Sequence, residues 1–173
     1  MIKNIFLTLI ALGFLVAEAD HIIFSRITIT PNDAEMVAIY NPTPDAINLS
    51  NYYLSDEGSY YYNLPLDDNY WSESNSSFIA RFPDVDIDPN QTLTIGLHNA
   101  DSFSNYYSTN PNFSLQEDML SVSNETNTIG SDSNMLYDNA ESIILFYLPV
   151  LNQLVYSLDA CFTIIQARNI RTS

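Results

Sequence analysis

Oxygen-bearing side chains stand at every second position in an acidic stretch near the middle of the chain: Asp84, Asp86, Asp88 and Asn90. Carboxylate and amide oxygens are the ligands that calcium prefers, and this ion takes roughly six to eight of them. An EF-hand loop, however, requires glycine where Pro89 stands and a closing glutamate that is missing here. The spacing leaves two interpretations: a weak structural calcium site, or a solvated acidic turn that points Val85 and Ile87 inward.

Aromatic side chains point to a second kind of chemistry. Tyr70 and Trp71 lie in a polar stretch, residues 65–77, that predicts a loop. Rings exposed on such a loop could stack against the apolar faces of sugars. The earlier tyrosines of this region fall on expected strands, whose alternation turns at least half of such rings into the core. Tyr70 and Trp71 are therefore the candidate ligand-binding residues, and core packing is the alternative reading of the aromatic series.

Groups that could carry catalysis are scattered along the chain rather than paired. His21 and His98 lie far apart, and His98 has no second histidine at metal-ligand spacing. Cys161 has no histidine near it in the sequence to act as a general base. Paired carboxylates are frequent because the chain is acidic, so they carry no signal for glycoside hydrolysis. The sequence therefore predicts that the protein is not an enzyme and that, calcium apart, it uses no cofactor.

The charge balance restricts the partners. The chain has 5 Lys and Arg against 21 Asp and Glu, which gives a formal net charge of −16. A surface that binds nucleic acid needs a basic patch to neutralise phosphates, and the summed field of this chain repels polyanions. The same field repels anionic lipid surfaces. We therefore expect neither nucleic acid nor an anionic membrane face among the partners.

The first residues read as a secretory signal peptide. Lys3 supplies a basic start, residues 5–16 an apolar segment, and Ala17-Glu18-Ala19 a cleavage site with small residues. The apolar segment is shorter than the roughly 20 residues that cross a bilayer, and no later segment is suited to span one. We expect residues 1–19 to be removed and the protein to be exported, as a secreted, periplasmic or cell-surface chain. The alternative is an uncleaved membrane anchor.

Short apolar runs alternate with turn residues in the rest of the chain. Residues 36–56 are the clearest case and predict two strands paired across a turn at Asn41-Pro42. Such runs predict strands within residues 21–30, 35–41, 47–49, 52–55, 60–62, 78–82, 91–97, 141–148 and 153–158. Many short strands with almost no helix pattern predict an all-β protein, an antiparallel β-sandwich.

Several of these runs carry finer expectations. The run at residues 91–97 places Leu93, Ile95 and Leu97 on one face. Residues 141–148 are apolar without alternation, which is typical of a central strand buried on both faces. One helical turn is expected at residues 102–107. The Asn- and Ser-rich residues 108–134 predict a long loop with one short element near residues 118–120.

Some of these segments resemble the lamin tail domain, and in particular the bacterial secreted branch of that family. The resemblance covers roughly residues 21–159 and rests on Ile39-Tyr40-Asn41-Pro42-Thr43, residues 47–56, Ala80-Arg81-Phe82-Pro83-Asp84, residues 92–95, Phe103, Tyr107 and residues 141–147. The chain departs from the family at Ala38, where an acidic residue is usual, and at Val85, where a turn glycine is usual. It departs again after residue 159, where relatives tend to continue with further acidic and aromatic sequence.

The resemblance implies an immunoglobulin-like β-sandwich at residues 20–159, followed by an atypical and possibly truncated tail at residues 160–173. It implies a secreted bacterial module without catalysis, which has a structural or binding role at the cell surface. The partner would then be an unidentified protein or a cell-surface glycan. Two alternatives stay open: a carbohydrate-binding module that uses Tyr70 and Trp71, and a calcium-assisted adhesion module that uses the acidic stretch.

Overall fold

The computed structural model describes residues 20–57, 78–122, 136, 141–147 and 162–167. Short strands dominate these residues, and they include a single α-helix. The elements are β1 (Ile23–Thr28), η1 (Asn32–Ala34, a 3-10 helix), β2 (Met36–Tyr40), β3 (Ile47–Asn48), β4 (Tyr52–Ser55), β5 (Ile79–Arg81), β6 (Asp86–Ile87), β7 (Thr92–Gly96), α1 (Ala100–Tyr107), β8 (Phe113–Ser114), β9 (Leu120–Ser121), β10 (Glu141–Tyr147) and β11 (Phe162–Ala167).

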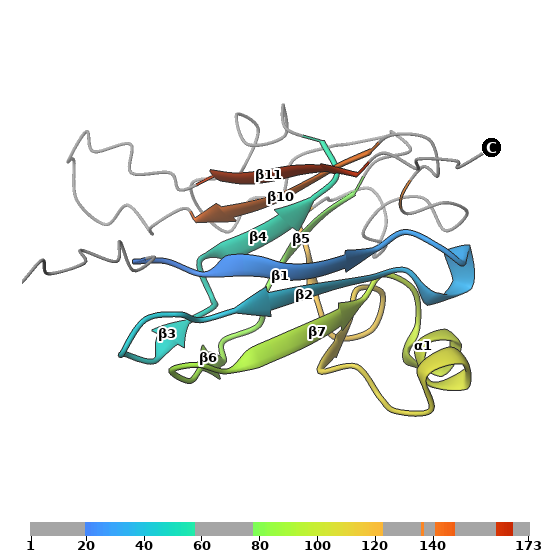
Figure 1. Ribbon diagram of the computed structural model, residues 1–173, viewed down its shortest axis with the longest axis horizontal. Coiled ribbons are helices and arrows are strands. Elements are labelled where there is room, and N and C mark those ends of the chain that lie inside the picture. Colours follow the sequence, from blue (N-terminus) through green and yellow to red (C-terminus); the bar gives the residue numbers. More distant parts are fainter. Residues whose placement is uncertain (1–19, 58–77, 123–135, 137–140, 148–161, 168–173) are drawn as a thin grey trace, which may run out of the picture.

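The strands form two main sheets and a small strand pair. The first sheet has the order β1-β2-β7-β8, and the second has the order β11-β10-β4-β5-β9. The strands β3 and β6 pair with each other at one end of the molecule, beside β2 and β7 (Figure 1). All pairings are antiparallel except that of β7 with β8, which is parallel. The predicted all-β sandwich is confirmed, with one sheet mixed rather than purely antiparallel.

The main core lies between the two sheets. Because successive side chains of a strand point to opposite faces, every second residue of each strand faces the other sheet. The first sheet contributes Phe24, Val37, Ile39, Leu93 and Ile95, and the second contributes Tyr52, Leu54, Ala80, Ile143 and Leu145. Leu97 belongs to the same cluster, so the shared face predicted for the 91–97 run is confirmed.

Strand β10 is buried on both faces, as its unbroken apolar run predicts. Ile143 and Leu145 belong to the main core, whereas Ile144 and Phe146 join Tyr53, Ile79 and Val122 in a second buried cluster. The strand pairs with β4 on one side and with β11 on the other. A strand with neighbours on both edges and apolar contacts on both faces is a central strand.

Helix α1 covers the outer face of the first sheet beside β2. Phe103 packs on Met36 and Ala38, and Tyr107 lies against the same cluster. The helix has eight residues rather than the single turn expected at residues 102–107. The Asn99 side chain caps its N-terminus by accepting a hydrogen bond from the Ser102 N–H at 2.8 Å. The helix therefore begins at Ala100, two residues before the expected turn.

The two strands expected to pair across Asn41-Pro42 do not pair with each other. Strand β2 lies between β1 and β7 in the first sheet, while β4 lies between β10 and β5 in the second. The segment between them crosses from one sheet to the other, and its strand β3 pairs with β6. The prediction of a hairpin was wrong because local alternation identifies strands without identifying their partners.

The stretch expected to be a loop after residue 108 contains two short strands. Strand β8 lies beside β7, and β9 lies beside β5. The acidic turn at residues 84–90 likewise contains β6. Strand β9 overlaps the short element expected near residues 118–120, whereas the two residues of β6 and of β8 carry too little alternation for a sequence pattern to reveal them.

The strand beside β10 at its outer edge is β11, residues 162–167. The strands expected at residues 153–158 and 60–62 lie outside the described residues. Strand β11 falls in the segment expected to be a tail beyond residue 159. Its pairing continues the second sheet into that segment.

Candidate functional site

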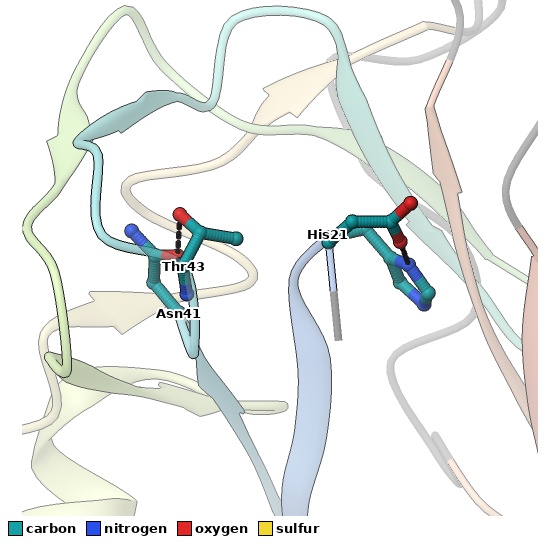
Figure 2. A network of polar contacts seen from close by, with 4 residues as sticks. His21, Asn41 and Thr43 are labelled. Carbon is teal, nitrogen blue, oxygen red and sulfur yellow. Dashed lines mark hydrogen bonds and ion pairs between the residues drawn. The ribbon is translucent and has the colours of Figure 1, made fainter. Parts of the chain in front are cut away.

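The Asn41 side chain is buried and makes a closed set of hydrogen bonds, of which Figure 2 shows the contact with Thr43. Its Nδ2 donates to the carbonyl oxygens of Asp45 at 2.8 Å and Ile87 at 3.0 Å. Its Oδ1 accepts from the Thr43 backbone N–H at 3.0 Å and lies 2.7 Å from the Thr43 hydroxyl. These bonds fix the turn that leads from β2 toward β3 and tie it to β6. The group has a structural role, because all its hydrogen-bonding capacity is used by the fold.

Asn48 repeats this local pattern on the surface. Its Oδ1 accepts from the Ser50 N–H at 3.0 Å and lies 2.6 Å from the Ser50 hydroxyl. Its Nδ2, however, faces two carboxylates and donates to Oδ1 of Asp84 and Oδ1 of Asp86, each at 2.8 Å. An amide group thus stands between the two acidic side chains where a bound cation would lie.

The four residues of the calcium candidate are divided among different partners. Asp84 and Asp86 converge on Asn48, whereas the Asn90 side chain accepts a hydrogen bond from the Tyr40 hydroxyl at 2.9 Å. Asp88 is exposed, and its backbone N–H donates to the Gln91 side chain at 2.7 Å. Among the described residues, no group of three or more His, Cys, Asp or Glu side chains is placed to hold a metal ion. Of the four candidates, Asp84 and Asp86 are the members that the structure brings together, through the Asn48 amide.

The ligand-binding candidates Tyr70 and Trp71 lie outside the described residues. The tyrosines of β4 are core residues: Tyr52 is in the main core and Tyr53 is in the second cluster. In the described part of the chain, the most exposed large apolar side chain is that of Tyr106 on α1, with 58% of its surface accessible. Its ring meets the Tyr107 ring edge to face, with centroids 4.9 Å apart.

His98 has a buried acidic partner that the sequence analysis missed. Its Nε2 lies 3.4 Å from Oε2 of Glu35, whose side chain has no accessible surface. The contact with Glu35 is the main cause that raises the pKa of His98 above its ordinary value, against the opposing effect of burial. A signal for Glu35 was present, because alternation in the strand predicted at residues 35–41 puts it on the same face as the core residues Val37 and Ile39.

His21, the other histidine considered for catalysis, has no such environment. The His21 ring contacts the neighbouring Asp20 carboxylate at 2.7 Å, and both residues lie at the start of the described chain, ahead of β1 (Figure 2). The Asp20 side chain is 94% exposed. Cys161 lies outside the described residues. His21 therefore forms a solvated surface contact between sequence neighbours.

Buried polar side chains in the second sheet also form hydrogen bonds with backbone atoms. Oδ1 of Asp56 accepts the Phe78 N–H at 2.8 Å, and the Ser55 hydroxyl donates to the Phe78 carbonyl oxygen at 2.7 Å. These bonds hold the start of β5 beside the end of β4. These side-chain hydrogen bonds replace the backbone ladder hydrogen bonds that are missing where the strands end.

Together the fold and these sites define the class of protein, an all-β sandwich whose described buried polar side chains hold its connections. Comparison with known proteins adds no family: the chain matches no protein-family model, no curated protein and no solved structure. In the part of the chain that the structure describes, no helix is long and apolar enough to cross a membrane.

Proposed function

We propose that the protein is an exported, non-catalytic β-sandwich module of the lamin-tail type, with a structural or binding role at the cell surface. The use of its buried polar groups supports this role most directly. Asn41, Ser55 and Asp56 are buried, and each is hydrogen-bonded to main-chain atoms of a connection or strand end. Side chains engaged in this way stabilise a scaffold and have no free capacity for proton transfer.

Two of the segments that resemble the lamin tail family lie at the connection between the two main sheets. Residues 39–43 end β2 and form the Asn41 turn, and residues 47–56 supply β3, which pairs with β6, and β4, which lies in the second sheet. The motif therefore lies where the chain crosses between sheets. A motif that forms a connection between sheets is expected in all members of a fold family, whatever ligand each of them binds. The resemblance therefore supports a shared fold rather than a shared ligand.

Charge limits the kind of partner that the module takes. With a formal net charge of −16, the surface is expected to repel phosphate-rich polymers and to favour neutral or basic groups. A surface protein or an uncharged glycan meets this requirement. We expect binding to a basic protein surface to weaken with salt, and binding to a neutral glycan to be insensitive to it.

A cell-binding experiment tests this function. Labelled protein comprising residues 20–173 is added to cells of the producing organism that lack the gene, and bound label is measured against concentration. Saturable binding that unlabelled protein displaces is the expected result. A Leu54→Asp variant, which places a charge at a fully buried position, supplies the misfolded control. Reproducible turnover on a panel of phosphoesters and glycosides would contradict the proposal, as would the absence of saturable binding.

The same experiment separates the two classes of partner. Protease treatment of the cells should abolish binding to a protein, and periodate oxidation should abolish binding to a glycan. If the glycan arm is positive, Trp71→Ala should remove the binding while Tyr52→Phe, a core substitution, leaves it unchanged. Tyr106→Ala tests the exposed aromatic ring of α1 as a second stacking site.

A further inference from the structure

The Glu35 carboxylate joins parts of the chain that are distant in sequence. The residue lies between η1 and β2, and its side chain has no accessible surface. Its Oε2 accepts the Leu136 backbone N–H at 3.2 Å and lies 3.4 Å from Nε2 of His98, just beyond β7. Its backbone oxygen accepts the Leu97 N–H at 3.0 Å. One residue thus connects the β1–β2 connection, the end of β7 and the segment at Leu136.

Leu136 is itself held in the core. Its side chain is 2% exposed and belongs to the main core between the sheets. Its N–H is bound to a carboxylate rather than to a neighbouring strand. A hydrogen bond to an ionised acceptor is stronger than one between neutral groups, so the charge on Glu35 affects how firmly Leu136 is held.

The described groups around His98 favour its protonated form. Asp33 and Glu35 act on the ring from the β1–β2 connection, and the backbone of Asn32 also hydrogen-bonds to it. On the other side the Ser114 hydroxyl donates to the His98 carbonyl oxygen at 2.8 Å. The nearby acidic groups of that side are engaged with main-chain atoms: Glu117 accepts the Ala100 N–H and Asp118 accepts the Ser114 N–H.

A charged His98 compensates the buried Glu35 carboxylate. A carboxylate in an apolar interior is stable when a cation and hydrogen-bond donors accompany it, and it becomes costly when the cation is removed. The His98 side chain is 13% exposed, and its Nε2 atom, which faces Glu35, is buried. The pair therefore has two states that differ in how well the same carboxylate is stabilised.

We propose that Glu35 and His98 form a pH-dependent latch, in which protonated His98 keeps the Glu35 carboxylate in place to bind the Leu136 N–H. Loss of the His98 proton weakens this hold and releases Leu136 from the β1–β2 connection. The latch concerns the regulation of local order and is separate from the partner that the module binds.

The sign of the pH dependence follows from the shift of His98. Its pKa is raised in the folded protein, so the stabilisation is fully present below the ordinary pKa of about 6.5 for histidine. The stabilisation is lost as pH rises through the folded pKa, because the folded state then gives up the proton that it had retained. The latch is therefore closed in mild acid and loosens in alkaline solution.

Amide hydrogen exchange at Leu136 measures the latch directly. In the protein comprising residues 20–173, we expect the protection factor of the Leu136 amide to fall severalfold between mildly acidic and alkaline pH, because the Glu35 carboxylate that holds this amide loses its charged partner. The Ile39 amide in the centre of the first sheet should keep its protection. Protection factors are used because they remove the intrinsic pH dependence of exchange.

Matched variants identify the groups responsible. The chain has 2 histidines, so His21→Gln is the control for His98→Gln. Glu35→Gln retains an acceptor for the Leu136 N–H and removes the charge. The pH response should vanish in His98→Gln and Glu35→Gln and persist in His21→Gln. Persistence in His98→Gln, or loss in His21→Gln, would overturn the latch.

The unsubstituted protein provides a test that does not depend on the variants folding. The His98 ring is titrated by NMR, and the midpoint is compared with the midpoint of the Leu136 protection change. Coincident midpoints above the ordinary histidine value support the latch. Separate midpoints, or Leu136 protection that is constant with pH, refute it.

Discussion

Asn41 and Asn48 show how the surroundings of a residue decide its task. Each begins an Asn-x-Thr or Asn-x-Ser turn in which its Oδ1 accepts the backbone N–H of the residue two positions on. Asn41 directs its amide to buried carbonyl oxygens, whereas exposed Asn48 directs its amide to Asp84 and Asp86. The same local geometry therefore stabilises the interior in one case and separates two like charges in the other.

This difference predicts unequal effects of substitution to alanine. Asn41→Ala leaves buried backbone groups without partners and should lower the free energy of unfolding by roughly 2 to 4 kcal/mol. Asn48→Ala should cost about 1 kcal/mol or less, because water can reach its partners. Urea unfolding followed by fluorescence measures both variants. Equal losses would show that the Asn41 network contributes no more than a surface turn.

The position of the Asn48 amide also predicts the response to calcium. Its Nδ2 is 2.8 Å from both Asp84 and Asp86, where it already neutralises part of their repulsion. A cation would have to displace it, so we expect the melting temperature to be the same with millimolar calcium and with a chelator. A calcium-dependent rise in melting temperature that Asp84→Asn removes would instead establish the metal site.

At the scale of elements, the stability of α1 depends on the residues at its two ends and on its contact with β7. Its last turn closes at Ser108, which has a left-handed backbone with φ 57. Gly96 of β7 lets the helix approach, because a Cβ atom there would lie 3.1 Å from Cδ2 of Phe103. The helix is short, so these local conditions contribute a large part of its stability.

Glycine substitutions on α1 should have opposite effects at two serines. Ser108→Gly relieves the left-handed backbone and should raise the free energy of unfolding by about 0.5 to 1 kcal/mol. Ser104→Gly, inside the same helix, is the matched control and should lower it by about 1 kcal/mol. Thermal melts of both variants and the parent protein give the comparison. A loss of stability in Ser108→Gly would contradict the helix end described here.

At the scale of the whole molecule, charge opposes the compact state. The formal net charge of −16 produces a self-repulsion that grows as the chain condenses. The two sheets overcome it by burying apolar residues from both sides of a shared core. Electrostatics therefore affects how stable the sandwich is, whereas apolar patterning decides which faces meet.

Salt should accordingly stabilise the protein. Added sodium chloride at about 0.5 M shortens the screening length to a few ångströms, which weakens the repulsion between surface carboxylates. We expect the melting temperature to rise from low salt to this concentration. Potassium chloride should act equally, because screening depends on ionic strength rather than on the cation. A fall in melting temperature with both salts would show that attractive ion contacts outweigh the repulsion.

The sequence by itself determined the longer strand segments before residue 148 and their inward faces. Alternation in β7 identified Leu93 and Ile95, and the unbroken apolar run of β10 identified a central strand, because side-chain direction along a strand is a local property. It also determined the charge, from which we expect the surface to repel polyanions. The likeness to the lamin tail family stays a prediction that rests on such local motifs.

Only the tertiary structure decided which segments meet. It placed β2 beside β7 and β4 beside β10, although the chain suggested that β2 and β4 were paired with each other. It also brought Glu35 to His98 and to Leu136, and gave Asp84 and Asp86 a shared amide. Contacts between residues distant in sequence depend on how complete sheets pack, and no local pattern of residues contains that information.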